Sequence, residues 1–562
     1  MNVNAPRHRR HARAWIVVLI SALLPLAAAP SALGRPKLVL QITVDQLRGD
    51  MPGRFRERFG PGGFRYLMDR GVHWINAHYE HSATYTGTGH ATLFTGAHPA
   101  QHGIIGNDWY SMKLRQRINC GEDPDHRILG EPTRAHKGTS PRNLLCSTVG
   151  DELIIATGGK GRVFSVSIKD RGAILPAGRL GKAFWYSDKT GRFVTSTYYY
   201  EQYPEWAAQW NAARPADQYR NTQWTLLKPR ANYLFGRQDD RPFERAYKDL
   251  GRTFPHPLGD DPDKFYASLR FTPMGDVLTL AFVKALIEHE NVGAGETADF
   301  LAVSFSATDA IGHAFGPNSL EAEDNLLRLD RTLDDLLAYV DERVGLDDTL
   351  IVLSSDHGVD AAPEHMGYMH AAAQGTAGRL DPKRLIEIAD AAARKHFGID
   401  RDLVLAYRSA GLYLDTRAIR DLELDPARVE QVVASALNEV PGVAYTATRT
   451  DLMRGRAQDQ SIMRMIQRSF HPQRSGHVMV IQRPSWYMHP KTVYSSMHGS
   501  PWSYDTYVPI ILVGAGIEPR VVHRRVGPQD VAPTIAMILN VQPPSGTAGR
   551  PLAEAFGVHH SD

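Results

Sequence analysis

The stretch "KLVLQITVD" at residues 37–45 consists largely of aliphatic and β-branched residues and ends on an acid, Asp45. Further runs of this character occur at 162–168, 299–306, 349–355, 477–482 and 508–514. Short apolar runs of this kind are typical of strands that are buried on both faces, as in a parallel sheet. Residues 37–45 therefore predict a buried parallel strand with a carboxylate at its carboxyl end.

Helical patterns lie between these predicted strands. Residues 272–290 begin with Thr-Pro, a suitable N-cap and first-turn pair, and then repeat apolar residues at helical spacing. Residues 321–342 place leucines and a valine on one stripe, with charged residues opposite. The alternation of strands and helices predicts an α/β sandwich, in which helices flank a central, mainly parallel sheet.

Two segments, 111–160 and 180–270, interrupt this alternation and are rich in Trp, Tyr, Arg, Pro and Gly. The second contains a predicted hairpin that turns at Lys189-Thr190-Gly191. Because ligands of α/β sheets bind at the carboxyl ends of the strands, we expect both insertions to form a cap over that edge. They belong to a single predicted domain at 35–562.

The first 34 residues have the pattern of an export signal. Four arginines precede the sixteen-residue apolar stretch "AWIVVLISALLPLAAA", and small residues around Ala29, Ser31 and Gly34 offer cleavage sites. This pattern predicts a periplasmic or secreted protein without stable membrane association after cleavage. A retained N-terminal anchor is the alternative, although the apolar stretch is short for a membrane span. The cleavage position and the export route stay open.

The charge of the chain changes once this segment is set aside. Residues 1–34 hold four of the 64 basic residues and none of the 61 acidic ones, so the net charge of the remainder is about −1 rather than +3. Overall charge therefore gives no support to nucleic-acid or membrane binding.

The chain has two cysteines, Cys120 and Cys146, which lie 26 positions apart. In an exported protein such a pair predicts a disulfide, and two free buried thiols are the alternative. Neither cysteine has a CxxC partner, so no thiolate metal site is expected.

Acids and histidines recur at the ends of the predicted strands. Asp356-His357 follows the run at 349–355, Asp309 follows 299–306 with His313 four residues later, and His498 lies in a loop before 508–514. Each residue alone could cap a helix or stabilise a loop. Together with Asp45 they match the oxygen and nitrogen ligands that Zn²⁺ accepts. Six ligands are too many for one tetrahedral ion, so the set predicts two ions.

The stretch "HSATYTGTGHATLFTG" at residues 81–96 has five threonines, and its composition alone indicates only a polar turn. The motifs before and after this stretch in the sequence indicate its function. Motifs at 42–50, 84–107, 306–313, 354–358, 497–512 and 530–552 resemble, in this order, those of the alkaline phosphatase superfamily. The resemblance covers essentially all of the chain after residue 36. It is greatest to the threonine-nucleophile bacterial phosphatases of the phosphate-irrepressible periplasmic type, and nucleotide pyrophosphatase/phosphodiesterases are related.

The resemblance implies a nucleophile and two Zn²⁺ ions per chain. The family nucleophile lies four residues before the histidine that is here His90, which makes it Thr86. One zinc would be held by Asp309, His313 and His498. The other would be held by Asp45, Asp356 and His357 and would also contact Thr86. A phosphothreonine would form at Thr86 and be hydrolysed by a hydroxide on the first zinc.

Three other polar residues in the stretch 81–96 are expected to support the site. Thr84 and Thr88 flank Thr86 and are candidates for bonds to the backbone or for contacts around the site. His90 is expected to be structural, because the resemblance already fills the metal-binding set.

Lys169 and Arg171, in "SVSIKDRGA", bear on the choice between monoesters and diesters. Their alternation at a predicted strand end lets both side chains point to one face. They resemble the Lys-x-Arg element of the threonine-nucleophile monoesterases, whose cations contact nonbridging phosphoryl oxygens and which phosphodiesterase relatives lack. Asn107 resembles the family's amide donor to the same group. A monoester dianion has more charge at those oxygens to compensate.

The resemblance therefore predicts an exported alkaline phosphatase for small-molecule phosphate monoesters, expected to be a monomer. The alternative is a phosphodiesterase or nucleotide pyrophosphatase with the same metals and threonine. A sulfatase would need a modifiable Cys or Ser in a CxPxR element, which neither cysteine offers. Cofactor-independent phosphoglycerate mutase resembles the metal core, but it is cytosolic and uses serine, so the predicted export signal and Thr86 count against this alternative. A non-catalytic metal-binding protein would not need this complete set of residues.

Overall fold

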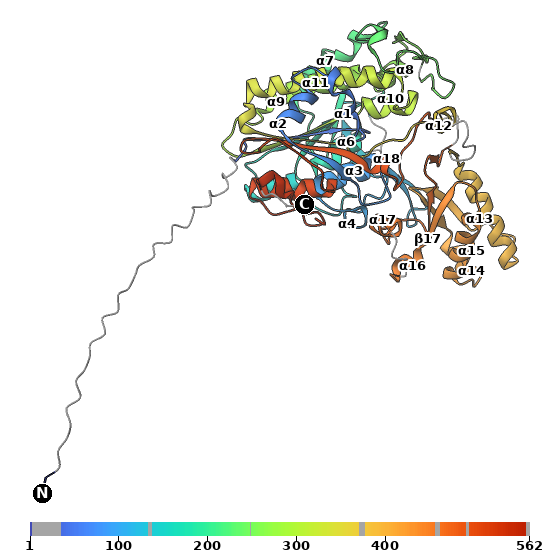
Figure 1. Ribbon diagram of the computed structural model, residues 1–562. Coiled ribbons are helices and arrows are strands. Elements are labelled where there is room, and N and C mark those ends of the chain that lie inside the picture. Colours follow the sequence, from blue (N-terminus) through green and yellow to red (C-terminus); the bar gives the residue numbers. More distant parts are fainter. Residues whose placement is uncertain are drawn as a thin grey trace. The chain divides into compact units, whose positions relative to one another are not determined.

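A mixed β-sheet forms the centre of the computed structural model (Figure 1). The structure describes residues 1–2, 35–132, 138–247, 249–369, 377–455, 461–489 and 494–557, so the predicted signal peptide lies almost entirely outside them. Within these ranges the sheet has eleven strands. Their order is β21 (Arg520–Val522), β2 (Val72–His78), β20 (Tyr507–Val513), β13 (Thr349–Ser354), β1 (Leu38–Val44), β12 (Asp299–Phe305), β7 (Val163–Ser167), β8 (Lys182–Tyr186), β9 (Phe193–Ser196), β5 (Glu122–Leu129) and β6 (Gly138–Thr139).

The central strands β13, β1, β12, β7 and β8 run parallel to one another. Val44 of β1 pairs with Phe305 of β12, and Thr43 pairs with Ser354 of β13. The chain therefore leaves these neighbouring strands at the same edge of the sheet. Parallel pairing is what confirms the α/β prediction made from the apolar runs.

Helices cover both faces of this sheet (Figure 1). Leu40 and Ile42 of β1 belong to a core that includes residues of α2 (Phe64–Arg70), α9 (Met274–Glu290) and α11 (Leu320–Arg343). Val39, which points to the other face, belongs to a core with residues of α3 (Thr86–Thr95), α5 (Val149–Ala156) and α19 (Val531–Leu539). Burial of each aliphatic side chain contributes roughly 1.5–3 kcal/mol, and the alternate positions Leu38, Leu40, Ile42 and Val44 all bury such side chains in the first core.

The predicted long helices are confirmed with small changes at their ends. Helix α11 extends the predicted 321–342 by one residue at each end, and its leucine stripe is buried. Helix α9 begins at Met274 with Pro273 as its N-cap, because the Thr272 hydroxyl donates to the Leu269 carbonyl instead of capping the helix.

Two of the predicted parallel strands are placed differently. The run at 508–514 forms β20, which is antiparallel to both β13 and β2. The run at 477–482 forms β18 (Val478–Gln482), which lies outside the central sheet. An apolar run predicts burial on both faces, but it carries no information on strand direction or on which sheet the strand joins.

Strand β18 belongs to a second, antiparallel sheet. Its order is β15 (Val404–Arg408), β16 (Gly411–Leu414), β18 and β17 (Val443–Thr448). Helices α13 (Pro382–Phe397), α14 (Thr416–Asp421) and α15 (Pro426–Asn438) share a hydrophobic core with it. Both sheets belong to one unit, Leu33–Asp562.

The segments predicted as insertions contribute strands to the central sheet as well as other elements. Strands β8 and β9 form the predicted hairpin, with Gly191 at a φ of 68° in its turn. The rest of 180–270 contains α7 (Glu205–Ala212), β10 (Gln223–Trp224), β11 (His256–Pro257) and α8 (Pro262–Leu269). Residues 111–160 contain most of the hairpin β3 (Asp108–Ser111) and β4 (Gln116–Asn119), then β5, β6 and α5. The cap itself stays a prediction.

The favoured disulfide is not formed. Cys120 and Cys146 are both free and buried. Cys120 lies in a core cluster with Ala91 of α3, whereas Cys146 lies against Gly546. The cysteines are therefore packed against different partners. Separately, none of the helices in the described ranges is both long enough and apolar enough to cross a membrane.

Helix α3 lies so close to the segment after β13 that we expect Gly89→Ala to destabilise the protein. A methyl group at Gly89 would meet the backbone oxygen of Asp356 at 1.9 Å, and backbone cannot yield as a side-chain end can. The expected loss is about 3 kcal/mol in the free energy of unfolding. Gly53→Ala, at an exposed helical position with open space around it, is the matched control and should change it by less than about 1 kcal/mol. Equal denaturation midpoints for the two variants would contradict this packing.

Candidate active site and metal centre

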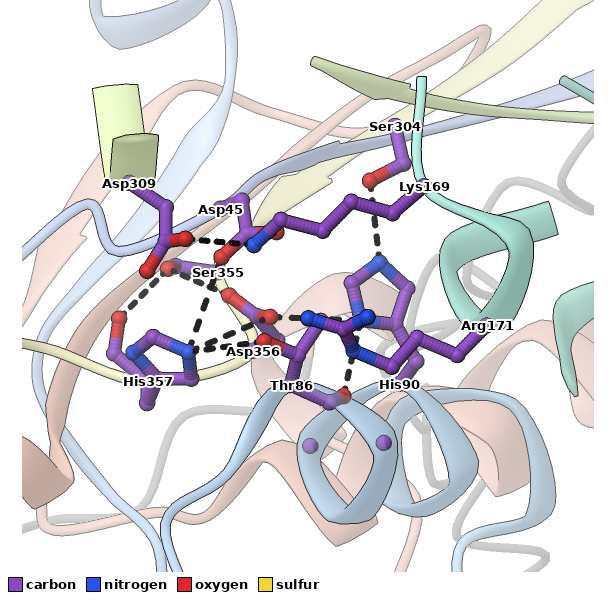
Figure 2. A network of polar contacts seen from close by, with 12 residues as sticks. Asp45, Thr86, His90, Lys169, Arg171, Ser304, Asp309, Ser355, Asp356 and His357 are labelled. Atoms are coloured by element: carbon purple, nitrogen blue, oxygen red, sulfur yellow. Dashed lines mark hydrogen bonds and ion pairs between the residues drawn. The ribbon is translucent and has the colours of Figure 1, made fainter. Parts of the chain in front are cut away.

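The strand ends of the central sheet bring the predicted acids together (Figure 2). Asp356 follows β13, Asp45 follows β1, Asp309 lies in α10 (Ala307–Phe315) after β12, and Lys169 follows β7. These four strands are neighbours in the sheet, in that order. The side chains therefore meet at the carboxyl edge, which is where ligands bind in α/β sheets.

Asp309, His313 and His498 form a first group that could hold a metal ion. Helix α10 begins at Ala307, so Asp309 and His313 lie one turn apart, as their spacing predicts. Nε2 of His313 lies 3.2 Å from Asp309 Oδ1, and Nε2 of His498 lies 3.5 Å from the same oxygen.

Asp45, Asp309 and His357 form a second such group. Nε2 of His357 lies 3.5 Å from Asp45 Oδ1 and 3.5 Å from Asp356 Oδ2, so Asp356 stands beside this group too. The ring of His357 stacks on that of His498 with 3.5 Å between centroids. The two groups are thus adjacent, and Asp309 is near both of them.

Each of these histidines is held in one orientation by the backbone. Nδ1 of His313, His357 and His498 contacts the carbonyl of Ser496, Gly358 and Thr84 at 2.8, 3.0 and 2.7 Å, respectively. A carbonyl only accepts hydrogen bonds, so Nδ1 carries the hydrogen and Nε2 of a neutral ring presents a lone pair. That lone pair faces a carboxylate in every case, an arrangement that a cation between them stabilises.

The charges at this edge also favour bound cations. Asp45, Asp309 and Asp356 are buried, and Lys169 Nζ lies 2.6 Å from Asp45 Oδ2 and 2.5 Å from Asp309 Oδ2. Burial, together with the charges of Asp309 and Asp356, raises the pKa of Asp45 well above its usual range. Burial lowers the pKa of His357 to about 3, which keeps the ring neutral as a metal ligand requires. The donor set fits divalent metals such as Zn²⁺.

Thr86 is the first residue of α3 and is 1% exposed. Its hydroxyl oxygen lies 3.5 Å from Nε2 of His357. The neighbouring threonines bind the backbone, as expected for them: Thr84 Oγ1 donates to Ser500 O at 2.8 Å, and Thr88 Oγ1 contacts the carbonyl of Tyr85 at 2.7 Å. Thr86 is therefore the threonine of this stretch whose hydroxyl lies beside a predicted metal ligand, His357 of the second group.

Two further residues, His90 and Gln46, contact these parts of the site. His90 Nδ1 lies 3.0 Å from the Thr86 carbonyl and 3.2 Å from Asp356 Oδ2, so it has the structural place expected for it and also contacts a predicted ligand. Gln46 donates from Nε2 to Asp309 Oδ1 at 2.7 Å and from its backbone N to Asp356 Oδ1 at 3.1 Å. Sequence reasoning missed Gln46, although it directly follows Asp45.

Lys169 and Arg171 reach the site from a different element than predicted. Strand β7 ends at Ser167, and Lys169 is the N-cap of α6 (Asp170–Ala177), so Arg171 lies in the first turn of a helix. The prediction of two alternating strand residues was therefore wrong, but both side chains still point toward the acids and Thr86 (Figure 2). Nε of Arg171 is buried without a hydrogen-bond partner in the described structure.

A cavity of about 430 Å³ opens onto this edge. Its walls include Asn107, Lys169, Arg171, Asp309 and His313, all predicted from the sequence. Asn107 Oδ1 accepts from the backbone N of Gly87 at 2.8 Å, which orients the amide beside Thr86. The wall across the cavity includes residues from the second sheet and the segments that follow it, among them Tyr407, Gln482, Trp486 and Tyr487.

Comparison with known proteins gives consistent matches over most of the chain. The pattern of the type I phosphodiesterase / nucleotide pyrophosphatase family matches residues 39–501. Alkaline phosphatase PhoV of Synechococcus elongatus is 36% identical over 93% of this chain and 94% of its own length. A Myroides odoratus protein named calcium-transporting ATPase is 35% identical over 94% and 96%. Alkaline phosphatase PafA of Elizabethkingia meningoseptica is 33% identical over 97% and 99%.

The fold agrees with a solved structure. A crystal structure of wild-type PafA matches with a TM-score of 0.86 at 33% identity, over 94% of this chain and 100% of that one. A second PafA structure, with a TM-score of 0.86, carries substitutions at one threonine, one asparagine, one lysine and one arginine.

The two adjacent ligand groups predict two bound divalent ions per chain. We expect Asp309→Asn to lose the ion of the first group and to weaken binding of the other, because Asp309 lies near both groups, and His313→Ala to lose one ion only. Elemental analysis by mass spectrometry after reloading with Zn²⁺ and gel filtration measures the ratio. Asp334→Asn, which alters an exposed acid on α11, is the control and should keep both ions. Retention of both ions by the Asp309 variant would contradict the assignment.

Proposed function

The chain belongs to the type I phosphodiesterase / nucleotide pyrophosphatase family, and within it we propose an alkaline phosphatase that hydrolyses phosphate monoesters through a phosphothreonine at Thr86. Its relatives PhoV and PafA are named alkaline phosphatases and match nearly their full lengths. The observation that carries the proposal is the convergence at one sheet edge of the Thr86 hydroxyl, two ligand groups and the cations Lys169 and Arg171.

We propose that the metals are two Zn²⁺ ions. Asp309, His313 and His498 would hold one, and Asp45, Asp356 and His357 the other, with Thr86 beside it. When bound, such ions lower the pKa of a hydroxyl group and stabilise charge on the attacking and leaving oxygens of a phosphoryl group.

In the first half-reaction the Thr86 oxygen attacks phosphorus. The new bond joins phosphorus to Thr86 Oγ1, whose proton passes to water, while the bond from phosphorus to the alcohol oxygen breaks and that oxygen takes a proton from water as the alcohol leaves. The N-terminus of α3 favours the negative charge that gathers there. In the second half-reaction water attacks phosphorus, Thr86 regains its hydroxyl and inorganic phosphate is released.

Lys169, Arg171 and Asn107 would bind the nonbridging phosphoryl oxygens. Asn107 uses its Oδ1 as the acceptor for Gly87, which leaves its amide NH₂ group as the donor. The substituted residues of the PafA variant are separated by 21, 62 and 2 positions, and Thr86, Asn107, Lys169 and Arg171 have the same separations. This agreement supports the carry-over of all four positions.

A phosphodiesterase or nucleotide pyrophosphatase is the second candidate, because the matching family is named for those activities. The observation against it is the pair Lys169 and Arg171 on the wall of the cavity. A diester phosphoryl group carries one negative charge and gains less from two cations than a monoester dianion does.

We also propose that the enzyme is exported and acts in the periplasm or outside the cell. The pattern of residues 1–34 supports this location. Small-molecule monoesters are its proposed substrates, without nucleic acid or membrane partners, and a monomer is the proposed state.

Thr86→Ala should reduce kcat/KM for p-nitrophenyl phosphate on the order of 10³-fold or more, since the nucleophile is lost. Acid quench during turnover, followed by peptide mapping, should find phosphate on Thr86 in the unmodified enzyme. Thr95→Ala is the control, because Thr95 lies at the far end of α3 and donates to the Ala91 carbonyl. Near-native turnover of the Thr86 variant would rule out this nucleophile.

The double variant Lys169→Ala/Arg171→Ala separates the two candidate activities. Bonds to charged groups contribute about 1.5–3 kcal/mol each, so we expect monoesterase kcat/KM to fall by at least about 10²-fold. The loss for bis-p-nitrophenyl phosphate should be smaller, so the monoester-to-diester ratio should fall. An unchanged monoesterase kcat/KM in the double variant would instead favour a phosphodiesterase.

A further inference from the structure

A further arginine, Arg270, lines the same cavity as Lys169 and Arg171. Arg270 directly follows α8 and is the C-cap of that helix. The adjacent Phe271 also lines the cavity, and its ring stacks on Tyr247 with 3.7 Å between centroids. Its backbone N donates to Ser268 O at 2.9 Å. The backbone that carries Arg270 is therefore fixed at the cavity wall.

Arg270 is less strongly paired than Lys169 and Arg117, which line the same cavity. Nζ of Lys169 lies between Asp45 and Asp309, and Arg117 contacts Asp108 at 2.8 Å. Arg270 has one carboxylate contact, from Nη1 to Asp188 Oδ2 at 3.2 Å, and the Asp188 side chain is 44% exposed. Solvent screens a pair of this kind.

Part of the Arg270 guanidinium is buried without compensation. Its Nε is buried and has no hydrogen-bond partner in the described part of the chain. A buried donor without an acceptor costs free energy, and an anionic ligand would remove that cost. Arg171 Nε is in the same condition. The cavity thus presents two incompletely satisfied guanidinium groups.

Arg171 and Arg270 line one cavity together with Tyr494. Tyr494 lies over the predicted ligand His313, with ring centroids 4.9 Å apart. Arg270 therefore lines the same cavity as the proposed phosphoryl-binding residues Lys169 and Arg171, on a part of the wall that the rest of a bound substrate can face.

We infer that Arg270 binds a second anionic group on the leaving part of the substrate, either a phosphate or a carboxylate. The inference rests on the proposed phosphomonoesterase function and specifies its substrate class. Lys169, Arg171 and Asn107 serve the phosphoryl group that is cleaved, which leaves Arg270 for another anion. A guanidinium can donate two parallel hydrogen bonds to either group. Substrates with an anionic leaving group are thus preferred over neutral analogues.

Matched substrate pairs test this preference. One pair is 3-phosphoglycerate and glycerol 3-phosphate, which differ in a carboxylate. The other is fructose 1,6-bisphosphate and fructose 6-phosphate, which differ in a phosphate. We expect the anionic member to have about tenfold higher kcat/KM in at least one pair, and the pair that responds identifies the anion. The ratio should fall as salt is raised.

Arg270→Gln should bring the ratio close to one, and Arg270→Lys should restore part of it. The ratio is taken within each variant, so a general loss of activity or folding cancels. Lys264→Gln, which removes an exposed cation of α8 that pairs with Asp249, should keep the unmodified ratio. A ratio near one in the unmodified enzyme, or an unchanged ratio in Arg270→Gln, would overturn the inference. Absence of hydrolysis of all four substrates would instead contradict the proposed function.

Discussion

The rest of the structure around the site depends on the buried carboxylates at the ends of neighbouring parallel strands. Asp45, Asp309 and Asp356 are removed from water and lie close together, and burial together with the charges of Asp309 and Asp356 raises the pKa of Asp45. Lys169 neutralises part of this negative charge through ion pairs with Asp45 and Asp309. The remaining negative charge and the Nε2 atoms of the histidines that face it favour further cations. The sheet therefore assembles a candidate metal site because its strands end at one edge.

Helix α3 depends on that same edge. Gly89 allows its backbone to lie against the backbone of Asp356, and His90 contacts both Asp356 and the Thr86 carbonyl. The proposed nucleophile Thr86 is thus positioned relative to Asp356, a predicted metal ligand, through the helix. Gln46, whose φ of 69° is unusual for a residue with a side chain, joins Asp309 to Asp356. Its strained backbone places one amide between the two ligand groups.

Much of the site could be predicted because its chemistry lies at positions that the strand pattern marks. Asp45, Asp309 and Asp356 follow apolar runs, and parallel pairing then brings them together without further information. The four-residue spacing of Asp309 and His313 likewise predicted that both side chains lie on one face of a helix. Gln46 was not predicted, because its role depends on a backbone conformation that no spacing reveals. Arg270 was missed because only tertiary folding brings the end of α8 to the cavity.

The errors in the fold have a common physical origin. Strands β18 and β20 are apolar because they are buried, and burial is independent of strand direction and of sheet membership. Lys169 and Arg171 were expected on a strand, but Ser167 ends β7 and the helix dipole favours Asp170 in the first turn of α6. The disulfide was expected because Cys120 and Cys146 lie close in sequence, but each thiol is buried against different neighbours and both are free.

The central claim is that this strand edge holds two metal ions beside Thr86. Anomalous X-ray diffraction at the zinc absorption edge, from crystals of the zinc-loaded protein, tests it most directly. The account predicts two anomalous peaks, one among Asp309, His313 and His498 and the other among Asp45, Asp356 and His357 next to the Thr86 oxygen. A single peak, or ions bound away from these residues, would contradict it.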